Sequence, residues 1–447
     1  MTASEVFYLS DYDFPDYSGR SAPERVDRVL YFRLDGIGDA VLSTPLLGAI
    51  KAKHPGAELT VVCDSLCEGL FGRSPHVDRV VALNKYRLGT KEYFNRAVRM
   101  AASCKADIAY NLVRSNNFTG FALSLLSGAP LVLAGNDCCC IDEAGRRFFE
   151  ARALRVLSVP EGWTLETEKY RSFLEQLGEP ADAYVPELWL DARDEEEAAT
   201  AWADSGFEPE NTIVLFASGG WPVRDYPFFG EALAPVCRRH GLSVLALGGG
   251  ERETLVNEYC AAVLRDAGVP ALNLCGRLSV TASAALLRRC RLAVGTETGL
   301  AHMACVFGVP QAIVLGGGHF GRFMPYSPLT TAVSLPLSCY RCNWHCPHAE
   351  PYCITGVRPD TVERAVEAVL AESAESAGSV GSAGPAEAPR FGALLLQSPS
   401  SWPAEKGRAE NGRTEEKRPR WRSPQDFIGW CRARCDGRDD CLAVRTI

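Results

Sequence analysis

The sequence lacks the two features that would mark a membrane-spanning or secreted protein. No apolar run reaches the roughly 20 residues that a membrane-spanning helix needs. The first residues, MTASEVFYLSDYDFPDYSGR, are acidic and aromatic, and they carry neither the cationic flank nor the apolar core of a signal peptide. We therefore expect a cytoplasmic protein, with peripheral attachment to the inner membrane as the alternative.

An excess of positive charge is also missing. The chain has 47 Lys and Arg residues against 55 Asp and Glu residues, which gives a formal net charge of −8. A surface of this sign does not attract the phosphate backbone of a nucleic acid. The charge therefore excludes nucleic acid as an expected partner and favours small molecules.

Cysteine is abundant, with 18 residues, but a disulfide framework is not expected. Most of the cysteines occur singly within apolar helical or strand patterns, as at Cys104, Cys237 and Cys290. A reduced thiol in such a position behaves as a small hydrophobic group.

Apolar runs of strand length alternate with helical patterns in both halves of the chain. They lie at 29–34, 59–63, 79–83, 107–112 and 130–134, and again at 212–217, 243–247, 271–274, 292–295 and 311–315. This alternation is typical of βαβ units and predicts an α/β protein with two parallel-sheet domains.

The domain boundaries follow from changes in composition. A proline-bounded extended segment followed by an acidic helix separates a first domain at 1–185 from a second at 186–372. Residues 373–447 are rich in Ala, Ser, Gly and Pro and then in mixed charges, with few apolar anchors. We expect this region to be a low-complexity, mostly disordered tail.

A glycine-spaced loop follows the first predicted strand in FRLDGIGDAVLSTPLL. Gly36 and Gly38 precede the predicted helix, so that its free N–H groups and dipole suit an anion or a developing negative charge. The dinucleotide fingerprint is incomplete, because Val41 stands where its third glycine would be. Asp39 has two interpretations at this stage, a helix N-cap or a catalytic carboxylate.

The stretch LAVGTETGLAHMACVFGVP repeats this arrangement in the second half. Glu297, Thr298 and Gly299 fall on the first turn of a predicted helix, where N–H groups and a hydroxyl can hold a diphosphate and a carboxylate can accept from sugar hydroxyls. His302 lies one turn further on the same face. The alternatives are an ordinary helix cap for Thr298 and a buried, hydrogen-bonded imidazole for His302.

Together with HVDRVVAL, SGGWPVRDYPFFGEAL and LGGGERETL, in this order, these segments resemble glycosyltransferase family 9, whose members include the lipopolysaccharide heptosyltransferases. The resemblance covers about residues 28–370. It implies a GT-B fold, in which two Rossmann-like domains face each other across a cleft, the first binding the acceptor and the second the nucleotide-sugar donor. It also implies an inverting transfer of a sugar, with heptose as a candidate, from a nucleotide-diphosphate sugar, expected to be an ADP-sugar, to a cell-envelope glycan or glycolipid.

The resemblance also assigns roles to single residues. Asp39 matches the family's catalytic base, and His302 matches its histidine. Arg224 stands where the family usually has Lys, and Glu297 stands where it usually has Asp; both are expected in the donor site with Thr298, Gly299 and His302. No metal cofactor is implied for catalysis. The two departures leave open a non-catalytic nucleotide-sugar-binding protein or a sugar-nucleotide epimerase on the same fold.

One cysteine cluster stands apart, in CYRCNWHCPHAEPYC. It contains Cys339, Cys342, Cys346 and Cys353, four thiols in one short loop. Four such groups suit a structural zinc ion or an iron–sulfur cluster, with reduced thiols packed in a loop as the alternative. A similar loop occurs in many members of the family, without an implied catalytic role.

Overall fold

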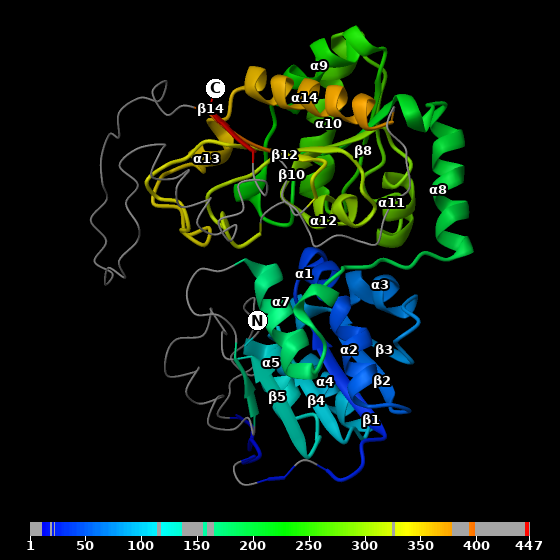
Figure 1. Ribbon diagram of the computed structural model, residues 1–447, viewed down its shortest axis with the longest axis vertical. Coiled ribbons are helices and arrows are strands. Elements are labelled where there is room, and N and C mark those ends of the chain that lie inside the picture. The colour runs from blue at the N-terminus through cyan, green and yellow to red at the C-terminus, as the bar shows by residue number, and fades with distance from the viewer. Residues whose placement is uncertain are drawn as a thin grey trace. The chain divides into compact units, whose positions relative to one another are not determined.

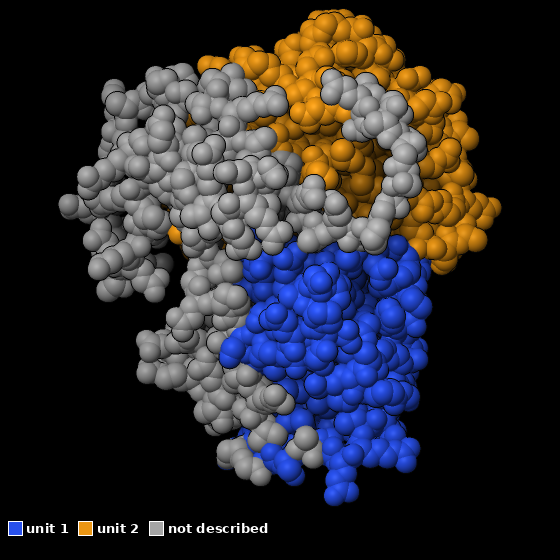
Figure 2. Space-filling model, in the orientation of Figure 1, with its two compact units in different colours: residues 1–189 blue, residues 190–447 orange. Residues whose placement is uncertain are grey.

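The structure, a computed structural model, describes residues 11–17, 20–21, 23–113, 118–135, 155–158, 165–323, 327–377, 393–397 and 443–446. The chain divides into two compact units, Met1–Trp189 and Leu190–Ile447, which are coloured separately in Figure 2. The second unit begins with helix α8 (Ala192–Ser205). Its start is fixed by a capping box in which Asp191 and Asp194 each accept a hydrogen bond from the other's backbone N–H.

The first unit contains one parallel sheet. Its strands are β1 (Arg28–Arg33), β2 (Glu58–Asp64), β3 (Arg79–Leu83), β4 (Ile108–Asn111), β5 (Leu131–Gly135) and β6 (Arg155–Leu157), in the order β3-β2-β1-β4-β5-β6. This is the strand order of the Rossmann fold.

Helices cover the sheet of the first unit. They are α1 (Ile37–Leu42), α2 (Pro45–Lys53), α3 (Glu68–Gly72), α4 (Lys91–Ser103), α5 (Phe118–Leu125) and α7 (Glu166–Leu177). Helix α2 packs against α7, and α4 packs against α5 (Figure 1). Phe94 of α4 and Phe121 of α5 share one core cluster with Leu30 and Phe32 of β1. Helices α4 and α5 therefore bury the face of β1 that carries these two side chains.

The second unit also contains one parallel sheet. Its strands are β7 (Thr212–Phe216), β8 (Ser243–Ala246), β9 (Ala271–Asn273), β10 (Leu292–Thr296), β11 (Gln311–Val314), β12 (Thr330–Ser334), β13 (Ala393–Leu396) and β14 (Ala443–Thr446), in the order β14-β13-β12-β11-β10-β7-β8-β9. Every residue of β7, β10, β11 and β12 is buried. Such burial on both faces is typical of a parallel sheet between two helical layers.

Two helical groups surround this sheet. Helix α9 (Phe229–His240) packs against α10 (Glu251–Asp266) and α14 (Pro359–Ala377), while α11 (Val280–Leu287) packs against α8 and α12 (Gly299–Val306) (Figure 1). Gly230 allows the contact between α9 and α10, because a Cβ atom there would lie 2.7 Å from Cβ of Val263. A short helix, α13 (Tyr352–Thr355), precedes α14.

The ten strands expected from the sequence, and the two parallel sheets that they form, are confirmed. Strands β6, β12, β13 and β14 were not expected. Two short strands are described in the region expected to be a mostly disordered tail: β13 pairs with β12, buries Leu394 and Leu395, and in turn pairs with β14. Residues 373–377 continue helix α14, and the other residues of that tail, apart from Gln397, lie outside the described residues. Within the described part of the chain, no helix is both long and apolar enough to cross a membrane.

Candidate active site

Both sheets have a point at which the strand order reverses. In the first unit it lies between β1 and β4, and in the second between β7 and β10. Open parallel sheets bind their ligands beyond the carboxyl ends of the strands at this point. Asp39 follows β1, Arg224 follows β7, and Glu297 follows β10. The sequence-predicted residues therefore lie where each sheet is expected to bind a ligand.

The loop after β1 settles the cap interpretation of Asp39. Gly36 is the N-cap of α1, Gly38 is the second residue of this helix, and Asp39 is the third. The N-cap residue, Gly36, has no side chain with which to cap the helix. Asp39 is partly exposed, and a Cβ atom on Gly36 would lie 3.3 Å from its Oδ2 atom. Asp39 is therefore not the helix cap, and a glycine leaves room beside its carboxylate.

A buried charged network holds this loop, and the sequence analysis missed it. Arg33 is fully buried at the end of β1. Its Nη2 atom donates to the Asp35 carboxylate, to the backbone carbonyl of Asp39 at 3.1 Å and to the Tyr170 hydroxyl at 2.8 Å, and its Nη1 atom donates to the carbonyl of Leu112 at 3.1 Å. Arg33 therefore fixes the backbone that carries Asp39. The signal in the sequence was a pair of charged residues, Arg33 and Asp35, at the end of an apolar strand.

The carboxyl group of Asp35 is electrostatically unusual. Burial raises its pKa to about 7, with a further contribution from the charge of Asp39, while Arg33 and Lys85 act in the opposite direction. Lys85 also donates from Nζ to the Asp35 carbonyl at 2.8 Å. A second titratable carboxyl group therefore lies next to Asp39 in the same loop.

In the second unit, Arg224 and Glu297 meet at the switch point. Arg224 ends the 3₁₀ turn Pro222–Arg224 after β7. Its Nη1 atom donates to the Glu297 carbonyl at 3.1 Å and lies 3.3 Å from Oε2 of the Glu297 carboxylate. The two side chains are only 18% and 11% exposed, so water screens their charges weakly. The structure thus brings together two residues that the sequence placed separately in the donor site.

Glu297 remains ionised in this position. Burial alone would raise its pKa, but Arg224, the hydrogen bond from His302 and the neighbouring His319 together hold it at about 2. Nε2 of His302 lies 3.2 Å from Oε1 of Glu297. His302 is therefore a buried, hydrogen-bonded imidazole, which was the structural alternative expected from the sequence. Its hydrogen-bond partner is the carboxylate of Glu297, a candidate donor-site residue.

Thr298 and Gly299 begin helix α12. Thr298 is the N-cap by position, but its hydroxyl makes no capping hydrogen bond, and Oγ1 is buried without a partner among the described residues. Gly219 packs against it, because a Cβ atom there would lie 2.9 Å from Cγ2 of Thr298 and 3.5 Å from Cδ of Arg224. A free buried hydroxyl, the N-terminus of an eight-residue helix and a guanidinium group thus lie together.

The motif LGGGERETL supplies a residue to which the sequence assigned no role. Arg252 of α10 forms an ion pair with Asp225 and donates to the carbonyl of Gly219 and, at 3.0 Å, to the Ser218 hydroxyl. Ser218 in turn donates to Asp225 at 2.7 Å. Arg252 therefore holds both ends of the loop that carries Arg224.

Tyr226 lies two residues after Arg224 but belongs to the core of the second unit. Tyr226 is fully buried, donates to the Val357 carbonyl at 2.9 Å and packs edge-on against Phe229. Tyr226 therefore stabilises the packing between the segment that carries Arg224 and the segment before α14.

The four clustered cysteines do not form a ligand set as they are placed. Burial raises the pKa of Cys353 to about 12, and the charges of Cys339, Cys342 and Cys346 act in the same direction, so the four thiols are neighbours. Even so, no three His, Cys, Asp or Glu side chains in the described ranges are grouped to hold a metal ion. The zinc or iron–sulfur expectation stays a prediction from the sequence, which elemental analysis would test.

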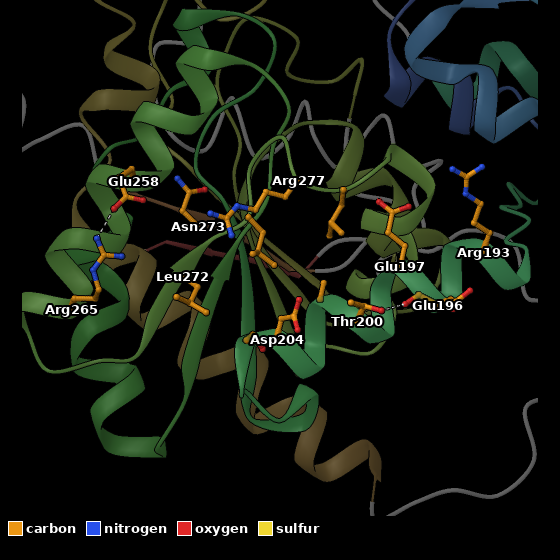
Figure 3. A pocket seen from close by; sticks show the side chains of 14 residues that line it. Arg193, Glu196, Glu197, Thr200, Asp204, Glu258, Arg265, Leu272, Asn273 and Arg277 are labelled. Carbon is orange, nitrogen blue, oxygen red and sulfur yellow. Dashed lines mark hydrogen bonds and ion pairs between the residues drawn. The ribbon is translucent and has the colours of Figure 1, made fainter.

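A separate hollow of about 910 Å³ lies beside β9, the outermost strand on its side of the second sheet (Figure 3). Side chains of α8, α10 and the segment after β9 line it, and Arg265 and Glu258 form an ion pair of 2.5 Å within it. Its charges are of both signs, and none of the predicted site residues lines it. It therefore contributes nothing to the candidate site.

Comparisons with known proteins agree with this arrangement. A family model described as glycosyltransferase family 9 (heptosyltransferase) matches residues 124–352, slightly more than half of the chain. Lipopolysaccharide heptosyltransferase 2 of Salmonella typhimurium is 22% identical over 300 residues, which cover 65% of this chain and 82% of that protein.

Solved structures show the same fold. A family 9 glycosyltransferase from Veillonella parvula matches with a TM-score of 0.64 at 20% identity, over 80% of this chain and 98% of that one. The ADP-heptose lipopolysaccharide heptosyltransferase II of Escherichia coli matches with a TM-score of 0.59 at 16% identity, over 78% and 99%. The two units are thus the two Rossmann-like domains of the GT-B fold, and the chain is a glycosyltransferase that belongs to glycosyltransferase family 9.

Proposed function

We propose that the protein transfers a heptose-type sugar, with inversion, from an ADP-sugar to a glycan or glycolipid of the cell envelope, with Asp39 as the general base. One observation carries the donor half of this proposal. At the switch point of the second sheet, the guanidinium group of Arg224 lies next to the Thr298 hydroxyl at the start of α12, which has no hydrogen-bond partner in the part of the chain that the structure describes. These groups suit a diphosphate.

The charges of the site fit a departing diphosphate. Arg224 offers a planar group that can bind two phosphate oxygens at once, and the N-terminus of α12 adds free N–H groups and a partial positive charge. The carbonyl and the carboxylate of Glu297 hold Arg224, and His302 in turn is hydrogen-bonded to this carboxylate. Such fixed positive groups stabilise the negative charge that develops on the leaving group, without a metal ion.

Asp39 supplies the proton acceptor. As the acceptor hydroxyl oxygen forms its bond to the anomeric carbon, its proton passes to the Asp39 carboxylate, and the bond from the anomeric carbon to the diphosphate breaks with its electron pair. One such displacement inverts the configuration. A general base of this kind contributes about 10²- to 10⁴-fold in rate.

The names of the relatives support the choice of substrates. The similar proteins are named as lipopolysaccharide heptosyltransferases, and one is named for ADP-heptose. We extend this to the present chain as an ADP-sugar donor and a glycolipid acceptor, with peripheral binding to the membrane that carries the acceptor. Sedimentation with anionic lipid vesicles tests the last point, and recovery of all the protein in the supernatant would refute it.

Two measurements test the function. Calorimetry and thermal unfolding with ADP, UDP, GDP and CDP should show one preferred nucleotide, because a ligand of the folded state raises its stability. Transfer assays with ADP-heptose should then show product for the wild type and for the exposed control Asp182→Asn, and none for Asp39→Asn at unchanged ADP affinity. Product formation by Asp39→Asn would refute the assigned base, and failure of all four nucleotides to bind would refute the donor site.

A further inference from the structure

The cysteine loop reaches the donor site through two aromatic side chains. The guanidinium carbon of Arg224 lies 5.3 Å from the centroid of the Trp344 ring, within cation–π range. The ring of His319 stands edge-on to Trp344 at 5.6 Å, and its Nδ1 atom lies 3.5 Å from Nη2 of Arg224. Arg224 is therefore enclosed by Glu297 on one side and by these two rings on the other.

The hydrogen bonds define the form of His319. A guanidinium group only donates, so Nδ1 of His319 accepts from Arg224. Nε2 must then carry the proton, and it donates to Oδ1 of Asn343 at 3.1 Å. Burial and, after it, the charges of Arg224 and Arg322 lower the pKa of His319 to about 3. His319 is thus a neutral imidazole whose tautomer Asn343 selects.

The backbone of the loop is held under strain for this contact. Arg341, Asn343 and Trp344 have φ angles of 70°, 50° and 60°, in the left-handed region that L-residues with side chains seldom adopt. Two hydrogen bonds fix the segment, from Arg341 N–H to the Gly317 carbonyl at 2.8 Å and from Asn343 N–H to the Gly318 carbonyl at 3.1 Å. Strained residues persist only where their surroundings hold them, and they occur often at functional sites.

The glycines at 316–318 leave space for two aromatic rings of the cysteine loop, those of Trp344 and Tyr340. A Cβ atom on Gly318 would lie 2.3 Å from Cδ2 of Trp344, and one on Gly316 would lie 2.7 Å from its Cη2. A Cβ atom on Gly317 would lie 2.2 Å from Cδ1 of Tyr340. Each glycine is thus needed for a close approach of the cysteine loop to the end of β11.

We propose that His319 and Trp344 are positioning residues for Arg224, and that the cysteine loop thereby keeps the guanidinium group oriented toward the diphosphate of the donor. The diphosphate part rests on the proposed function; the coupling between the three side chains does not. The loop is in this view part of the donor site, with Trp344 as its contact and Asn343 as the residue that orients His319.

The test compares ADP with AMP, which lacks the second phosphate. Calorimetry on full-length Trp344→Leu should show ADP binding weakened about 3- to 10-fold, the range of a partly buried cation–π contact, with AMP binding changed less than about 2-fold. Trp344→Phe should fall between this variant and the wild type. Gly318→Ala, which displaces the ring without removing it, should reproduce Trp344→Leu.

Matched controls separate positioning from stability. Trp202→Leu removes another buried tryptophan of the same unit and should lower the midpoint of thermal unfolding without changing the ratio of ADP to AMP affinity. His240→Gln, at an exposed histidine, is the control for His319→Gln and should not change the ratio of ADP to AMP affinity. In an Arg224→Ala background, Trp344→Leu should have no further effect on ADP binding, because the group that it positions is gone.

Three results would overturn the proposal. The first is unchanged ADP affinity in Trp344→Leu or, if that variant does not fold, in Trp344→Phe and His319→Gln, while Arg224→Ala loses affinity. The second is an additive effect of Trp344→Leu in the Arg224→Ala background. The third applies if the wild type binds no nucleoside diphosphate, in which case the proposed function fails by itself. The coupling between the side chains would then be refuted if the effects of Arg224→Ala and Trp344→Leu on the free energy of urea unfolding were additive.

Discussion

Replacing Arg224 with Ala should lower both the stability of the second unit and its affinity for ADP, for two separable reasons. Breaking a buried ion pair by removing one partner costs about 3 to 5 kcal/mol, because the other charge stays buried. Here the two side chains are 18% and 11% exposed, and the hydrogen bond from His302 to Glu297 remains. We therefore expect a loss of about 2 kcal/mol, which lowers the unfolding midpoint by roughly 4 to 8 °C for a unit of this size.

Affinity should fall by a different amount. Charge-assisted hydrogen bonds contribute about 1.5 to 3 kcal/mol each, so ADP should bind about 10- to 150-fold more weakly. Arg224 is the main group that lowers the pKa of Glu297 against the effect of burial. Without Arg224, the pKa of Glu297 should therefore rise from about 2. The double variant Arg224→Ala/Glu297→Gln then removes the unpaired charge while it keeps the shape of the side chain. It should recover most of the stability and none of the ADP affinity.

Thermal unfolding and calorimetry on the same preparations provide both readouts. Arg238→Ala, at an exposed position on α9, is the matched control and should change neither quantity by more than a small amount. Unchanged ADP affinity in Arg224→Ala would remove this residue from the donor site. Failure of Glu297→Gln to restore stability would show that the loss did not come from an unpaired carboxylate.

Three further predictions concern other parts of the structure. Because the pKa of His319 is lowered to about 3, the unfolded chain binds a proton more readily than the folded one between about pH 6.5 and pH 3, so stability should fall with decreasing pH in this window by at most about 1.4 kcal/mol per pH unit. Urea unfolding at several pH values should show a shallower slope for His319→Asn, and an equal slope would contradict the assignment. Gly219→Ala should weaken ADP binding in calorimetry, because the new Cβ atom would lie 2.9 Å from Cγ2 of Thr298 and would displace this residue. Overpacking of this kind costs about 1 to 3 kcal/mol. Wild-type affinity for ADP would show that the spacing between Gly219 and Thr298 is not critical. Arg33→Met should lower the free energy of urea unfolding by about 3 to 5 kcal/mol, because it leaves Asp35 buried without its ion-pair partner. Arg33→Met/Asp35→Asn should recover part of this loss. An unchanged free energy of unfolding in Arg33→Met would show that the ion pair contributes nothing to stability.

The sequence alone determined ten of the described strands and about where each of them ends. Strand-length apolar runs followed by glycine loops and helical patterns are local features, because each depends on residues within a few positions of one another. Parallel strands connected by helices place their carboxyl ends at one edge of the sheet. This is why Asp39, Glu297 and Thr298 could be named as candidate site residues before their positions were known, whereas Arg224 was named from the family resemblance.

Only the tertiary structure decided which side chains meet. Arg224 contacts Glu297 across 73 residues of chain and His319 across 95, and Arg33 contacts Tyr170 across 137. No local pattern encodes such contacts, since strand order and register set them. The same holds for β13, whose apolar residues became a strand only because the edge of β12 offered unpaired backbone groups. A sequence thus carries the local preferences of each segment, whereas the electrostatics of a buried site depend on distances between segments that only packing fixes.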